Sequence, residues 1–123
     1  MKQKVKQKML MLTLPHPPSV NTYWGFKGSH RYLTPKAKLF KQEVWIAFLN
    51  SKHIGFKDAR LSITVNLYAP DKRVRDIDNP IKPLLDALTQ AKVFNDDGQV
   101  DRLTVIRGEP TKGGLCTVII NIL

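Results

Sequence analysis

Two aspartates separated by one residue, Asp76 and Asp78, stand in the run RVRDIDNPIK of a strongly basic chain. Lys82 follows one helical turn later, and the acidic pair Asp96 and Asp97 comes further on. In an extended segment, side chains two residues apart point to the same side. Carboxylates, water and substrate phosphates are the usual ligands of Mg²⁺. The pattern therefore favours a Mg²⁺ site that handles a phosphate ester, with Asp97 as third ligand if its turn lies beside the helix start.

The same aspartates also have an ordinary structural interpretation. Aspartate before a helix is commonly a cap, and the sequence NDDG is typical of a turn. A cap needs only one carboxylate and does not account for Asp76 together with Lys82. A calcium loop is excluded because DIDNPIKPLLDA lacks the glycine and the distal glutamate of that pattern. Zinc is disfavoured because the chain has no His-x-x-x-His or Cys-x-x-Cys pair.

Length and charge restrict the architecture and the partner. The 123 residues suit one domain, and 20 Lys and Arg against 10 Asp and Glu favour a polyanionic partner such as nucleic acid. We expect residues 1–8 to be a basic, mobile tail and residues 9–123 to be a single domain. Without the four lysines of that tail, 16 basic residues still face 10 acidic ones.

Hydropathy and cysteine content bear on the compartment. No apolar run approaches the roughly 20 residues of a spanning helix, and the basic start is not followed by a secretory pattern. We therefore expect a cytoplasmic protein with no membrane association. The single cysteine, Cys116, lies in an apolar run and is predicted to be a buried small side chain.

The elements that must position these residues follow from periodicity. Alternating apolar residues predict strands at 9–14, 61–69, 100–107 and 115–122. Helical spacing predicts one helix from Pro35 to about Asn50, capped by Thr34, and a second from Asp78 or Asn79 to about Lys92. The order strand, helix, strand, helix, strand, strand predicts an α+β domain, with two helices packed on a mixed sheet of about four strands.

The segment 21–33 interleaves aromatic and basic side chains without periodicity, so it is predicted to be a loop. Such a loop suits stacking on unpaired bases beside phosphate contacts, although its aromatics could equally cover the edge of the sheet. Candidate nucleic-acid contacts in this part of the chain and in the later basic segments are Asn21, Tyr23, Trp24, Lys27, Arg31, Lys72, Arg73, Arg75 and Lys112.

The run RDIDNPIKPLLDALTQAKVFNDDGQVD, residues 75–101, resembles the central signature of the RusA family of Holliday junction resolvases. The opening LPHPPSVNTYW and the late turn TKGG resemble further segments of that family, so the resemblance covers most of the chain after residue 8. It departs from the family at Pro80 and Pro83, in the first turns of the second helix.

This resemblance implies a homodimeric, Mg²⁺-dependent endodeoxyribonuclease that cuts four-way DNA junctions symmetrically. It further implies that Asp76, Asp78 and Asp97 bind one or two Mg²⁺ ions and that Lys82 is the essential lysine. Asp86 and Asp96 also match positions of the family pattern. One alternative is a non-catalytic nucleic-acid-binding module whose aspartates only cap helices and form turns. Another is a phosphomonoester hydrolase or sugar-nucleotide transferase using Asp-x-Asp.

Overall fold

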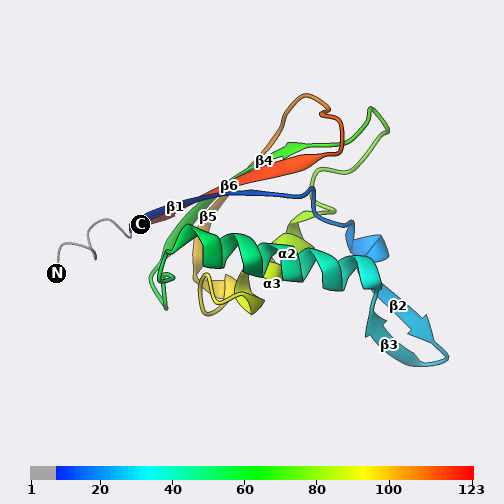
Figure 1. The fold of residues 1–123 in the computed structure, drawn as a ribbon, viewed down its shortest axis with the longest axis horizontal. Helices are drawn as coiled ribbons and strands as arrows, with labels where there is room; N and C mark the ends of the chain where they lie inside the picture. The colour runs from blue at the N-terminus through cyan, green and yellow to red at the C-terminus, as the bar shows by residue number, and fades with distance from the viewer. Residues whose placement is uncertain (1–7) are drawn as a thin grey trace.

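A computed structural model describes residues 8–123, in which one four-stranded sheet carries two helices on the same face (Figure 1). The elements in chain order are β1 (Met9–Leu14), α2 (Pro35–Ser51), β4 (Leu61–Tyr68), α3 (Ile81–Gln90), β5 (Val100–Arg107) and β6 (Leu115–Ile122). This order confirms the predicted α+β fold with a mixed sheet. The predicted basic tail lies outside the described residues except for Lys8, whose carbonyl accepts a hydrogen bond of 3.1 Å from the Ile122 N–H.

The sheet has the strand order β1-β6-β4-β5, in which β4 and β5 are parallel and the other neighbours are antiparallel. The parallel pair requires a crossover connection, which contains α3. Parallel strands end at the same edge of a sheet, and Leu67 near the end of β4 pairs with Arg107 at the end of β5. The segment 69–80 therefore leaves the sheet beside the end of β5.

The core forms between the helices and one face of the sheet because buried and more exposed residues alternate along β1, β4 and most of β6. In β4, Leu61, Ile63 and Val65 are fully buried, and the intervening side chains are partly exposed. The predicted cap of α2 is confirmed, since the Thr34 hydroxyl accepts a hydrogen bond from the Ala37 N–H. Cys116 is a buried free cysteine, as predicted. Other core side chains come from β1, α2, α3 and β6 and include Leu12, Phe40, Val44, Leu84, Leu88, Val118 and Ile120.

The expectation of an irregular loop over residues 21–33 is wrong. After the short 3-10 helix η1 (Val20–Thr22), strands β2 (Trp24–Lys27) and β3 (His30–Leu33) pair as an antiparallel hairpin. Its two-residue turn is possible because Gly28 adopts a φ of 63°, which favours glycine. Figure 1 shows this hairpin projecting beyond the start of α2, away from the C-terminus and the start of β1.

No helix within residues 8–123 combines the length and the apolar content needed to cross a membrane.

Candidate active site

The first pair of predicted ligands, Asp76 and Asp78, lies in a turn ahead of α3. The Asp76 carbonyl accepts a hydrogen bond from the Asn79 N–H at 3.3 Å, and the Asp78 carbonyl accepts one from the Ile81 N–H at 3.1 Å. Helix α3 begins later than predicted because this turn occupies residues 77–80. Its N-cap is Pro80, and no side chain caps it. The interpretation of Asp78 as a helix cap is therefore wrong.

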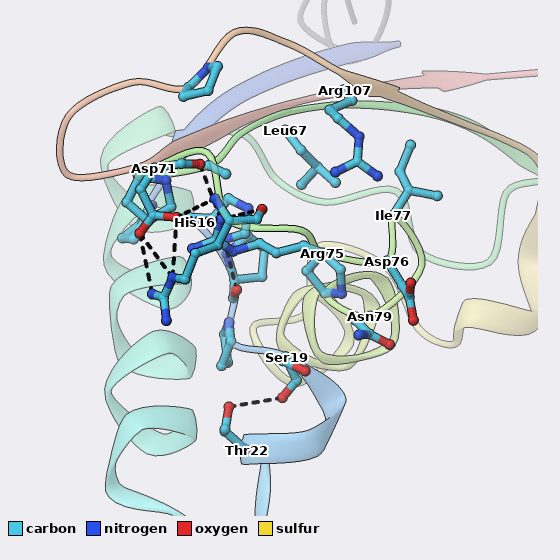
Figure 2. A pocket seen from close by; sticks show the side chains of 18 of the residues that line it. His16, Ser19, Thr22, Leu67, Asp71, Arg75, Asp76, Ile77, Asn79 and Arg107 are labelled. Carbon is cyan, nitrogen blue, oxygen red and sulfur yellow. Dashed lines mark hydrogen bonds and ion pairs between the residues drawn. The ribbon is translucent and has the colours of Figure 1, made fainter.

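Both carboxylates are exposed, and neither makes a hydrogen bond or an ion pair with the described residues. The turn that carries them is attached to η1, because the Val20 N–H donates to the Asn79 carbonyl at 2.9 Å. The start of η1 is in turn fixed by the Ser19 hydroxyl, which accepts from the Asn21 N–H. Figure 2 shows Asp76 and Asn79 near Ser19 at one side of a groove. The backbone thus presents two unengaged carboxylates to solvent on a fixed turn.

Lys82 connects the start of α3 to η2 (Asp97–Gln99). Its Nζ lies 2.9 Å from Oδ2 of Asp97, and α3 and η2 are in contact. The turn that carries Asp97 therefore lies beside the start of α3, as predicted. The hydrogen bond from Asp97 raises the pKa of Lys82 above its usual value, with smaller contributions from the charges of Asp86 and Asp96. Lys82 is accordingly an ammonium ion at neutral pH, and 69% of its side chain is exposed.

The second acid of that turn, Asp96, has a structural role. Its carboxylate accepts from the Gly98 N–H at 2.7 Å, while the side chain of Gln99 accepts from the Asp96 N–H. This reciprocal pair is a capping box at the start of η2. Buried Gln99 also donates to two carbonyls of the 57–59 segment, so the turn carrying Asp97 is firmly held.

The donor set suits Mg²⁺ by its chemistry, because Asp76, Asp78 and Asp97 offer only carboxylate oxygens. Within residues 8–123, however, no three acidic, histidine or cysteine side chains converge as a ready metal cage. Oδ2 of Asp97 is instead bound by Lys82. The assignment of these three aspartates to a shared ion stays a prediction.

Asp86 belongs to a separate polar cluster that joins three elements. Its Oδ2 accepts a hydrogen bond from the Tyr23 hydroxyl and lies 3.0 Å from Nζ of Lys41 on α2. Burial by itself would raise the pKa of Asp86, but the bonds from Tyr23 and Lys41 outweigh it, and the pKa lies below its usual value. Burial and the same bond raise the pKa of Tyr23. Lys82 and Asp86 are four residues apart on α3 but do not form a salt bridge, because Lys82 pairs with Asp97 and Asp86 with Lys41.

The predicted stacking role of Tyr23 is corrected by this cluster. Only 4% of its surface is exposed, so its ring is not available to a base. It supports the hairpin instead, with its ring packed edge-on against Trp24 at a centroid distance of 5.3 Å. Sequence reasoning could not find this role because Asp86 is 63 residues away along the chain.

The remaining candidates on the hairpin are accessible. The Arg31 guanidinium lies 3.8 Å from the centroid of the Trp24 ring, and Lys27 is exposed near the turn. Phe26 and Tyr32, which belong to the aromatic set of the predicted loop, are 67% and 43% exposed. The hairpin therefore combines aromatic surface with basic groups, as single-stranded or distorted nucleic acid requires.

A groove of about 1040 Å³ opens beside Asp76, between the 15–19 loop, α2, the 69–77 loop and the end of β5. Its lining includes the predicted contacts Lys72, Arg73 and Arg75 and two that sequence reasoning missed, Lys36 and Arg107. Arg107 could have been found only from the parallel pairing of β4 and β5. Lys112 is exposed in the β5–β6 connection, next to Gly113 of the groove wall.

The sequence model described as endodeoxyribonuclease RusA matches residues 15–122 of the chain. The chain belongs to the RusA family. A crossover junction endodeoxyribonuclease of Enterobacteria phage HK97 is 43% identical over 101 residues, which is 82% of this chain and 84% of the relative. The proteins of the same name from Shigella sonnei (strain Ss046) and Escherichia coli (strain K12) are each 34% identical over 104 residues, or 84% of this chain and 86% of theirs.

The RusA match extends over every part of the candidate site. It includes the 76–80 turn, the Lys82–Asp97 contact, the projecting hairpin and the groove, because all of them lie between residues 15 and 122. Strand β1 lies ahead of the match, although it supplies an edge of the sheet.

Proposed function

We propose that this RusA-family protein is an endodeoxyribonuclease that cuts four-way DNA junctions by symmetric, Mg²⁺-dependent phosphodiester hydrolysis. The observation that carries the proposal is the contact between Lys82 and Asp97, which places the acidic turn beside the start of α3. There it joins a segment whose two carboxylates, Asp76 and Asp78, have no partner among the described residues. A purely structural use of Asp76 and Asp78 does not explain why both carboxylates lack a partner among the described residues.

The proposed metal ligands are Asp76, Asp78 and Asp97, for one or two Mg²⁺ ions. A bound Mg²⁺ would supply Lewis acidity and neutralise charge on the phosphate. Lys82 has a different role in this proposal: its ammonium group opposes the negative charge that develops on the scissile phosphate. The exposed side chain can turn from Asp97 to a phosphate oxygen, because exposed ion pairs contribute little free energy, about 0 to 1 kcal/mol.

DNA is proposed to contact both the hairpin and the groove. Trp24 and Arg31 offer a stacking surface, with Lys27 and Asn21 beside it. Lys72, Arg73, Arg75 and Lys112 are proposed contacts to the DNA backbone, and Lys36 and Arg107 extend the same basic lining. Tyr23 is not among the proposed contacts because it is buried.

Two further features of the proposal follow from the substrate. A four-way junction presents two equivalent strands, and two copies of one subunit would each bring one site to it, so we propose a homodimer. We also propose residues 9–123 as the catalytic domain, residues 1–8 as a basic tail, and the cytoplasm as the compartment.

The test is a gel assay of a synthetic four-way junction and a linear duplex of the same sequence, each with Mg²⁺ or with EDTA. The proposal predicts paired nicks in the junction only, and only with Mg²⁺. Asp58→Asn serves as a control for Asp78→Asn, because Asp58 is also an exposed turn aspartate and does not line the groove. Junction binding without any cleavage by the wild-type protein would favour the non-catalytic binding module.

A further inference from the structure

Two arginines in the groove are held by a single carboxylate of the same loop. Oδ1 of Asp71 lies 2.8 Å from Nη1 of Arg75, and Oδ2 lies 3.3 Å from Nη2 of Arg73. The Nε of Arg73 also donates to both oxygens at 3.3 Å, and the Arg73 backbone N–H donates to Oδ1 at 3.0 Å. Figure 2 shows these bonds converging on Asp71 at the groove wall.

This arrangement has the donors of an oxyanion site. A guanidinium presents its N–H groups in a planar fork that binds carboxylates and phosphates in the same two-point geometry. Here the Arg73 guanidinium contacts both carboxylate oxygens of Asp71, and the Arg75 guanidinium contacts Oδ1. The Arg73 backbone N–H donates a further hydrogen bond to Oδ1. The hydrogen bonds from Arg75 and Arg73 also lower the pKa of Asp71, so the occupant is an anion at neutral pH.

The surroundings favour a DNA backbone as the exchanging ligand. Asp71, Arg73 and Arg75 line the same groove as the proposed ligand Asp76. Lys36, Lys72 and Arg107 line it as well, and none of them has an ion-pair partner within residues 8–123. Arg75 is further bound to the Asp71 and Arg73 carbonyls at 3.2 and 3.3 Å, so it keeps its place when the carboxylate is displaced.

We infer that Asp71 is an internal occupant of a phosphodiester-binding site formed by Arg73, Arg75 and the Arg73 N–H, and that substrate DNA must displace it. The inference rests on the proposed DNA cleavage, whose residues it extends. Asp71 thereby weakens DNA binding and is a determinant of affinity, not a ligand of the metal. Removing its charge releases two guanidinium groups for phosphate contacts.

The test compares Asp71→Asn with Asp101→Asn in a junction-binding titration with EDTA, across 50 to 200 mM KCl. Asp101 is a closely matched control, since it pairs with Arg60, is also 43% exposed and lies near the opposite end of β5. Both variants change the net charge equally. We expect Asp71→Asn to bind about three to thirty times more tightly than wild type, because two exposed ion pairs no longer compete. Its salt dependence should steepen by about one to two units of log K per log salt.

Asp101→Asn should stay near wild type in both measurements. Adding Arg73→Ala to Asp71→Asn should remove most of the gain, which shows that the effect is local. The inference is overturned if Asp71→Asn binds no more tightly than Asp101→Asn, or if it binds more weakly than wild type with an unchanged thermal unfolding temperature. Failure of the proposed function is a different result, in which wild-type protein with Mg²⁺ leaves the junction uncut.

Discussion

The Tyr23 hydroxyl allows a quantitative check on how the start of the hairpin is attached to α3. Tyr23→Phe keeps the buried ring and its contact with Trp24 but removes the donor to Asp86. A hydrogen bond to a charged group is worth about 1.5 to 3 kcal/mol. The side chain of Asp86 is 35% exposed and keeps Lys41 as a partner, so solvent screening places the expected loss at the lower end, about 1 to 2 kcal/mol.

The assay is urea unfolding of wild type, Tyr23→Phe, Asp86→Ala and the double variant. A double-mutant cycle isolates the coupling between the two side chains, which we expect to be about 1 kcal/mol or more. Because the folded-state pKa of Asp86 is depressed, its stabilising contribution is complete above the ordinary aspartate value of 3.8 and is lost as the pH falls through the folded pKa. The penalty of Tyr23→Phe should follow this pH dependence. A coupling below about 0.3 kcal/mol at pH 7 would refute the reasoning.

Three further predictions concern the lysine, the hairpin and the cysteine. Lys82→Ala should reduce junction cleavage at least a hundredfold, about the cost of losing one group that stabilises the transition state, and leave junction binding within a few fold, with exposed Lys38→Ala as control. A cleavage rate like that of the control would reduce Lys82 to a structural ion pair. Arg31→Ala should weaken junction binding and lower its salt dependence by about one unit, whereas Arg102→Ala on β5 should not. Cys116, whose pKa burial raises to about 12, should react with a thiol reagent at pH 8 only after unfolding; fast reaction of the native protein would contradict its placement.

Much of the fold could be predicted from the sequence because the strands and the helices carry regular apolar patterns. The alternation Leu61, Ile63, Val65 identified β4, and Thr34 followed by Pro35 marked the start of α2. The hairpin escaped detection because none of its strand residues is buried, so its short strands show no alternation of buried and exposed positions. Its stability depends on Tyr23 and Asp86, a contact that local sequence does not reveal.

Only part of the candidate site could be predicted from the sequence. The spacing of Asp76, Asp78 and Lys82 could be recognised along one segment. Asp97 could be placed beside them by assuming that the chain bends back after α3, and its contact with Lys82 shows that bend. The partners of the other charges depend on tertiary packing. Lys41 of α2 forms an ion pair with Asp86. Asp71 forms ion pairs with Arg73 and Arg75, which were predicted from the sequence as phosphate contacts.

The central claim is that Asp76, Asp78 and Asp97 share a divalent ion although their side chains are not already clustered. The most direct measurement is a titration of the protein with Mn²⁺, in the absence of DNA, followed by paramagnetic broadening of the amide signals. The account predicts that the signals of all three aspartates broaden together at substoichiometric Mn²⁺ and recover when excess Mg²⁺ is added. Broadening that reaches Asp76 and Asp78 but leaves Asp97 sharp, or that persists unchanged in Asp78→Asn, would contradict it.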